Sequence, residues 1–135
     1  MQPRQQGDRG EMSAIDWLDS QGYTVFVPLQ HGPDVDLIAT RGEEILRIEV
    51  KTSTFRRGER CEVTVCTRGG NRSWSGLSKR FDGARCEYLF ILVADGRRWM
   101  IPAREVGGSK VMLGGPKYAE YEVEKGRPIL RLAEA

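Results

Sequence analysis

Apolar and charged residues alternate along residues 44–52, which read EILRIEVKT. A period of two is typical of a β-strand that buries one face, because successive side chains point to opposite sides. The preceding residues 34–40 form a second short run that is β-branched and apolar, and Arg41 and Gly42 supply a turn between the two runs. The pattern therefore predicts two adjacent strands joined by a tight turn.

The rest of the pattern predicts one helix before this pair of strands and further strands after it. Met12, Ile15 and Leu18 share one helical face, which predicts a helix from Arg9 that ends at Gly22. Strands are predicted at residues 23–27, 62–67, 88–93 and 99–101, a hairpin turn at 95–96, a short helix at 77–81, an edge strand or dimer-contact arm around 118–123, and a short strand at 129–132.

This order of elements predicts a single α/β domain with a central mixed β-sheet flanked by helices. The 135 residues suffice for one domain with a substantial core but not for two. We expect residues 1–8 to be a flexible N-terminus and residues 9–135 to form the domain.

Composition indicates an ordinary globular protein, with 39% apolar and 30% charged residues. No apolar run is long enough to cross a bilayer, and the polar N-terminus does not resemble a secretion signal. We therefore expect a cytoplasmic protein that does not contact a membrane. In that reducing setting Cys61, Cys66 and Cys86 are expected to be buried or strand-lining thiols rather than disulfides or a zinc site.

Charge is distributed unevenly along the chain. Residues 1–55 hold five Lys/Arg and nine Asp/Glu, a balance of −4, whereas residues 56–85 hold eight and three, a balance of +5. An acidic half beside a basic segment suits a nucleic-acid enzyme, because carboxylates can hold a metal ion while cations contact phosphates. The alternative for these cations is a solvated surface. The candidate DNA-binding residues are Arg56, Arg57, Arg60, Arg68, Arg72, Lys79 and Arg80.

Three ionisable residues of the predicted strand pair are candidates for one site. Asp36 lies in an apolar run, where a carboxylate is costly to bury unless its charge is compensated. Glu49 and Lys51 lie two apart on one strand, so they share a face at a spacing of roughly 7 Å. Two carboxylates can share a Mg²⁺ ion, and such an ion beside an ammonium group suits phosphodiester hydrolysis. A structural ion pair at a sheet end is the alternative.

The spacing of these residues resembles the signature of the PD-(D/E)XK nuclease superfamily. Asp36 is followed by twelve residues and then by Glu49-Val50-Lys51. Gly10-Glu11 resembles the helical Gly-Glu pair of these nucleases, and residues 87–90 (EYLF) and 99–102 (WMIP) resemble two of their later strands. The flanking elements resemble group I intron-associated homing endonucleases and Holliday-junction resolvases. The intron-associated branch often has tyrosine at the position of Val35 and glutamine at that of Glu49.

The resemblance implies a restriction-endonuclease-like core and a Mg²⁺-dependent DNA endonuclease, with Mn²⁺ as a substitute ion. Asp36, Glu49, a main-chain oxygen of Val50 and Glu11 would hold metal, and Lys51 would orient or activate water. The substrate would be double-stranded or branched DNA. One chain offers one active site, so cutting both strands implies a homodimer, a higher oligomer or sequential nicking.

Several alternatives stay open at this point. Glu11 fits equally well as the closing residue of a helix capping box with Asp8. His31 could contact the phosphate or the attacking water, although a lone loop histidine is usually just solvated. Asp34 could be the metal ligand instead of Asp36, but its place beside Pro33 favours a turn residue. Beyond intron-type and resolvase-type nucleases, the chain could be a non-catalytic DNA-binding module or a protein interaction domain.

Overall fold

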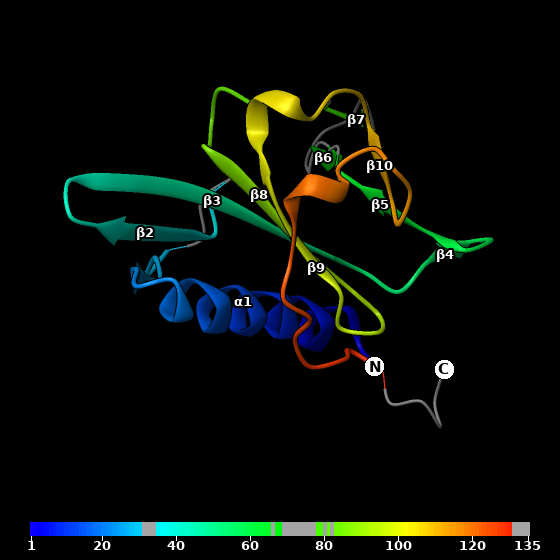
Figure 1. Cartoon of the computed structure of the whole chain (residues 1–135), viewed down its shortest axis with the longest axis horizontal. Coiled ribbons are helices and arrows are strands. Elements are labelled where there is room, and N and C mark those ends of the chain that lie inside the picture. The colour runs from blue at the N-terminus through cyan, green and yellow to red at the C-terminus, as the bar shows by residue number, and fades with distance from the viewer. Residues whose placement is uncertain (31–34, 66, 69–77, 80, 82, 131–135) are drawn as a thin grey trace.

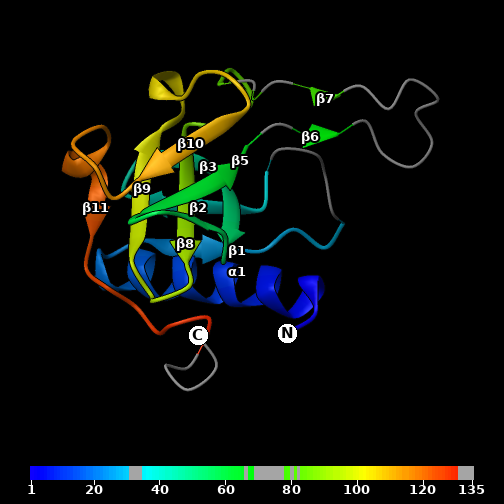
Figure 2. The same ribbon diagram turned by 90° about the vertical axis from the view of Figure 1, so that its right-hand side faces the viewer.

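A six-stranded mixed sheet forms the centre of the fold, with a helix on one face and a three-stranded sheet on the other (Figures 1 and 2). The computed structural model describes residues 1–30, 35–65, 67–68, 78–79, 81 and 83–130. The elements are α1 (Pro3–Ser20), β1 (Thr24–Phe26), β2 (Leu37–Arg41), β3 (Glu44–Ser53), β4 (Arg56–Arg57), β5 (Arg60–Thr64), β6 (Thr67–Arg68), β7 (Ser78–Lys79), β8 (Tyr88–Val93), β9 (Arg98–Pro102), η1 (Ala103–Glu105), β10 (Lys110–Leu113), η2 (Ala119–Tyr121) and β11 (Glu122–Val123).

The central sheet has the strand order β1-β2-β3-β8-β9-β11, and only β3 and β8 in it run parallel. The second sheet has the order β10-β5-β4, and β6 pairs with β7 in a separate two-stranded ribbon. This architecture confirms the predicted α/β fold with a central mixed sheet. No helix within the described ranges is both long and apolar enough to cross a membrane.

Two hydrophobic clusters hold the three layers together. The first lies between α1 and the central sheet and includes Ala14, Leu18, Ile48 and Phe90. The second lies between the two larger sheets and includes residues of β5, β8, β9 and β10, with Trp99 1% exposed. Strand β8 is shared by both clusters because its alternate side chains point to opposite faces. Its apolar run (YLFILV) is therefore buried on both sides.

The helix begins at Pro3 rather than at Arg9. Proline suits the first helical position, and the Gln2 N–H donates to Gln5 Oε1 across the first turn (3.4 Å). Glutamine and arginine are good helix formers, so a polar stretch extends the helix without an apolar stripe. Glu11 thus lies inside the helix, and the capping-box interpretation with Asp8 is wrong.

Gly10 allows α1 to approach the central sheet closely. A Cβ at this position would overlap the Thr52 methyl group and would lie 3.1 Å from Val50 Cγ1. Ala14 and Leu18, which follow at helical spacing, are fully buried against the same face. The glycine therefore sets the distance between the helix and the C-terminal half of β3.

Substitutions at Gly10 and Gly7 are expected to change stability in opposite directions. Gly10→Ala gains about 1 kcal/mol of helix propensity but should be net destabilising by about 1–3 kcal/mol because it overpacks Thr52. Gly7 lies in the same helix and has nothing within 4 Å of its Cβ position, so Gly7→Ala should stabilise by up to about 1 kcal/mol. Urea unfolding of both variants measures the two effects. Equal stabilisation by both would contradict the close approach.

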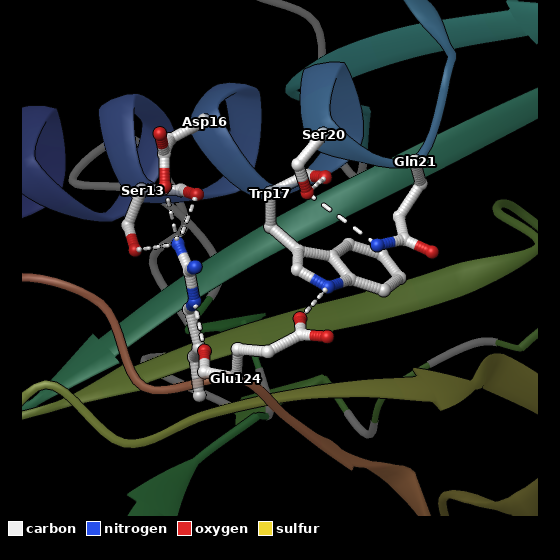
Figure 3. A network of polar contacts seen from close by, with 7 residues as sticks. Ser13, Asp16, Trp17, Ser20, Gln21 and Glu124 are labelled. Atoms are coloured by element: carbon white, nitrogen blue, oxygen red, sulfur yellow. Dashed lines mark hydrogen bonds and ion pairs between the residues drawn. The ribbon is translucent and has the colours of Figure 1, made fainter.

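The C-terminal segment lies along α1 and is bound to it by polar contacts. Trp17 Nε1 donates to Glu124 Oε2 (2.8 Å), as Figure 3 shows. Arg98 of β9 is only 5% exposed, and its guanidinium donates to the carbonyl oxygens of Glu124 and Ser13 and to Asp16 Oδ2. The buried arginine therefore joins strand, helix and C-terminal segment.

The structure differs from the sequence analysis at two places. Ser78 and Lys79 form a strand paired with Thr67 and Arg68, so the short helix predicted over 77–81 is wrong at these positions. Strand β10, which no sequence pattern predicted, pairs with β5 and buries Val111 and Leu113. Both differences arise from pairing between distant segments, which local patterns do not record.

Candidate active site

Glu49 and Lys51 lie on one face of β3 and form an ion pair. Lys51 Nζ is 3.1 Å from Glu49 Oε1, and the side chains are 25% and 5% exposed, respectively. The face is the one predicted from their spacing of two residues, because Ile48 and Val50 pack against α1 on the other side. A nearly buried carboxylate with an ammonium partner is thus present at this point of the sheet.

Asp36 lies where β2 begins to pair with β3, and its carboxylate is held by the backbone of β3. The Asp36 N–H donates to the Ile48 carbonyl (2.9 Å), although Leu37 is the ladder partner of Ile48. Two consecutive residues thus oppose one residue of β3, as in a β-bulge, a feature that redirects side chains. Asp36 Oδ2 accepts the Val50 N–H at 2.7 Å. The Asp36 carboxylate therefore reaches β3 between Glu49 and Lys51 along the strand.

Glu11 is half-buried on α1, one residue after the glycine that contacts β3. Within the part of the chain that the structure describes, no three His, Cys, Asp or Glu side chains gather closely enough to hold an ion. Asp36, Glu49 and Glu11 thus do not form a three-carboxylate cluster, and a metal-binding role for Glu11 stays a prediction. His31 and Asp34 lie outside the described residues.

Five of the seven predicted DNA-binding residues lie on strands that follow β3. Arg56 and Arg57 form β4 and are exposed, and Arg60 begins β5. Arg68 and Lys79 belong to the β6–β7 ribbon, which extends away from the two larger sheets in Figure 2. Arg72 and Arg80 lie outside the described residues.

A polar cavity of about 400 Å³ adjoins the end of β3. It is lined by Gln6 of α1, by residues 52–55, and by Glu62 and Thr64 of β5. The sequence interpretation did not include this cavity among the candidate sites. The run of three hydroxyl residues directly after Lys51 is the signal that could have indicated it.

Glu87 and Arg47 form an ion pair near the site. Burial raises the pKa of Glu87, but hydrogen bonds from the side chain and N–H of Arg47 outweigh that effect, so its pKa lies below the usual value. This pair fixes the start of β8 against β3.

The described cysteines are buried thiols, as predicted. Burial raises the pKa of the Cys61 thiol, and Cys86 is also buried. Cys66 lies outside the described residues.

The chain is similar to a solved structure and to a known protein family. The chain is similar in fold to a bacterial homing endonuclease, I-Ssp6803I, with a TM-score of 0.77 and 19% sequence identity over 90% of this chain and 89% of that one. Among curated proteins, none matches this chain significantly. The family described as PD-(D/E)XK endonuclease matches residues 1–131. Because this match spans nearly the whole chain, including Asp36, Glu49 and Lys51, the protein belongs to the PD-(D/E)XK endonuclease family.

Proposed function

We propose that the protein is a Mg²⁺-dependent DNA endonuclease that hydrolyses phosphodiester bonds at the site formed by Asp36, Glu49 and Lys51. One observation carries the proposal: the Asp36 carboxylate is bound to the Val50 N–H, and Val50 stands between the two members of the Glu49–Lys51 ion pair. One acid thus contacts the backbone of β3 at the residue between the acid and the amine that form the ion pair. The family match supports the same activity.

The donor set at this site fits a hard divalent cation. Asp36 and Glu49 offer carboxylate oxygens, and Glu49 is 4% exposed, so its charge requires compensation. In a strand the N–H and C=O of one residue point to the same edge, so the Val50 carbonyl also faces the side on which Asp36 lies. Oxygen-only sets of this kind suit Mg²⁺, and Mn²⁺ can replace it. When bound, the ion would polarise the scissile phosphate and lower the pKa of a water molecule.

The protein groups contribute position and charge. The hydrogen bond from Val50 fixes the direction of the Asp36 carboxylate, which lowers the reorganisation needed to bind an ion. Lys51 is partly exposed, so its ammonium can leave Glu49 and contact the attacking water or the phosphate. Glu11, on the neighbouring helix, would act as an outer or second-metal ligand.

Cleavage assays test this proposal. Supercoiled plasmid, linear duplex and four-way-junction DNA should be incubated with the protein in Mg²⁺, in Mn²⁺ and in EDTA. Metal-dependent cleavage is expected, with none in EDTA. Cleavage of equal rate in EDTA would refute the proposal.

The type of endonuclease is proposed from the structural neighbour, which is a homing endonuclease. We infer a site-specific, intron-type activity, so a few defined fragments are expected from linear duplex. Preferential cleavage of the four-way junction would instead identify a junction resolvase. Binding without cleavage in any metal would identify a DNA-binding module.

One site per chain supports assembly as a homodimer or higher oligomer, because a double-strand break requires two hydrolysis events. Analytical ultracentrifugation with and without DNA measures the oligomeric state. Cuts on both strands in one binding event are expected from the assembled form.

The arginines of β4 are expected to contact DNA phosphates. Replacing both Arg56 and Arg57 with glutamine should weaken binding and reduce the slope of log K against log salt by about two, since each phosphate contact contributes about one. Fluorescence anisotropy at several salt concentrations measures this. The matched control removes two exposed arginines elsewhere, Arg104 and Arg127. An equal slope change in both double variants would contradict a specific phosphate-binding role for β4.

A further inference from the structure

The polar cavity beside Lys51 has the composition of a base-binding pocket. Its lining begins one residue after Lys51, and Ser53 lies two residues beyond Lys51 on the same face of β3, roughly 7 Å along the strand. At that distance a ligand in the cavity can belong to the same DNA strand as a phosphate held at Lys51. The cavity also has the volume of a small-molecule site, about 400 Å³.

Phe55 has an exposed aromatic ring at this cavity, and hydrogen bonds fix its backbone. The residue is 57% exposed, yet its N–H donates to Ser53 Oγ (3.1 Å) and its carbonyl accepts the Glu62 N–H (3.2 Å). The Ser53 hydroxyl in turn donates to the Glu62 carbonyl at 2.7 Å. These bonds fix the backbone of Phe55, and its exposed ring is a surface on which a flat group can stack.

Apart from Glu62, the other lining side chains are neutral hydrogen-bonding groups. Gln6 Nε2 donates to Thr52 Oγ1 (3.4 Å), so the Thr52 hydroxyl keeps its own proton for donation. Thr54 and Thr64 add two further hydroxyls. Such groups can serve as both donors and acceptors, which is what the edge of a nucleobase requires.

The described lining residues of the cavity include no cation that would bind a phosphate. Among its described lining residues, the charged side chain is the carboxylate of Glu62, which Arg57 and Lys110 approach at 3.5 and 3.3 Å. A phosphate would meet that carboxylate, whereas a base carries no charge. An aromatic ring, neutral donors and a compensated carboxylate therefore favour a base.

We infer that this cavity binds one nucleobase, unstacked from the DNA next to the scissile phosphate, with Phe55 stacking on it and Gln6, Thr52 and Thr54 contacting its edge. The inference rests on the proposed DNA cleavage at Lys51 and adds a determinant of substrate choice. A base can cover the Phe55 ring only after it leaves its neighbour in the duplex, so unpaired, frayed or kinked positions are favoured.

Fluorescence of 2-aminopurine tests the inference. A duplex carrying one unpaired 2-aminopurine is titrated with the protein in Ca²⁺, and the quenching that accompanies stacking is recorded together with anisotropy. The wild-type protein should quench the probe and bind this duplex more tightly than a fully paired one. Phe55→Leu should remove the quenching and weaken binding to the unpaired probe at least about fivefold. Gln6→Leu should keep the quenching but change the relative affinity for the four unpaired bases.

The matched control is Phe26→Leu, because Phe26 is 53% exposed and lies on the edge strand β1. It should behave as the wild type. If Phe55→Leu quenches the 2-aminopurine and binds the duplex as the wild type does, the base-binding inference is wrong. Mg²⁺-dependent cleavage by the wild type would still leave the proposed function intact. If the wild type neither cuts nor binds DNA, the proposed function is refuted as well.

Discussion

Replacing Lys51 with methionine is expected to slow DNA cleavage by about 10²–10³-fold or more. The ammonium lies 3.1 Å from Glu49 and is partly exposed, so it can reach a phosphate or a water molecule. Methionine keeps the length of the side chain and removes its charge. Asp36→Asn should have an effect of similar size, because an amide keeps an acceptor for the Val50 N–H but loses the negative charge needed to hold a cation.

Two control variants separate chemistry from structure. Arg41→Met removes an exposed ion pair with Glu44 (3.3 Å), and Asp95→Asn alters a carboxylate that also accepts a backbone N–H, that of Arg97 (3.0 Å). Both should cleave DNA within about twofold of the wild type, since such surface interactions contribute little to stability. Single-turnover rates and anisotropy give cleavage and binding separately. Full activity in Lys51→Met would mean that the Glu49–Lys51 pair is only structural.

Truncation of Phe90 is expected to have a large effect on stability. Its side chain is fully buried between α1 and the central sheet, and the ring of Trp17 lies 6.3 Å away, centroid to centroid. Phe90→Ala removes buried apolar surface and leaves a cavity, so the free energy of unfolding should fall by about 3–5 kcal/mol. Chemical denaturation followed by circular dichroism measures the change.

Phe26→Ala is the matched control for that measurement, because Phe26 is 53% exposed. Its effect should stay below about 1 kcal/mol. Comparable losses in both variants would show that the helix–sheet cluster does not dominate the stability of the domain.

The central strands were predictable because their patterns are local. The alternation in residues 44–52 and the unbroken apolar run of 88–93 each correspond to an observed strand. The hairpin turn at Asp95-Gly96 was equally predictable, because this dipeptide favours a tight turn. In the structure Gly96 has a positive φ and its N–H donates to the Val93 carbonyl. The start of α1 was not predictable, because a stretch of glutamine and arginine has no periodic apolar positions.

The pairing of distant segments could not be predicted from local patterns. Strand β10 lies in a glycine-rich region and is stabilised by its ladder with β5. Ser78 and Lys79 have no strong preference for a strand, and their conformation depends on pairing with β6. Residues 129 and 130, predicted as part of a short strand, instead donate their N–H groups to the Ala94 carbonyl in a bend.

For the site, the spacing predicted that Glu49 and Lys51 share a face, and the structure shows them in contact. The spacing could not predict the bulge at Asp36, which depends on how two strands meet and which directs the carboxylate to Val50. Nor could it predict the cavity that adjoins Lys51, because Gln6 and Thr64 join residues 52–55 only through tertiary packing.

The most direct measurement is a crystal structure of the protein soaked in Mn²⁺, with data collected at the manganese absorption edge. An anomalous difference peak is expected in contact with the carboxylates of both Asp36 and Glu49, and it should be absent from the Asp36→Asn variant. A peak bound elsewhere, or an equally strong peak in the variant, would contradict a metal site formed by these two residues.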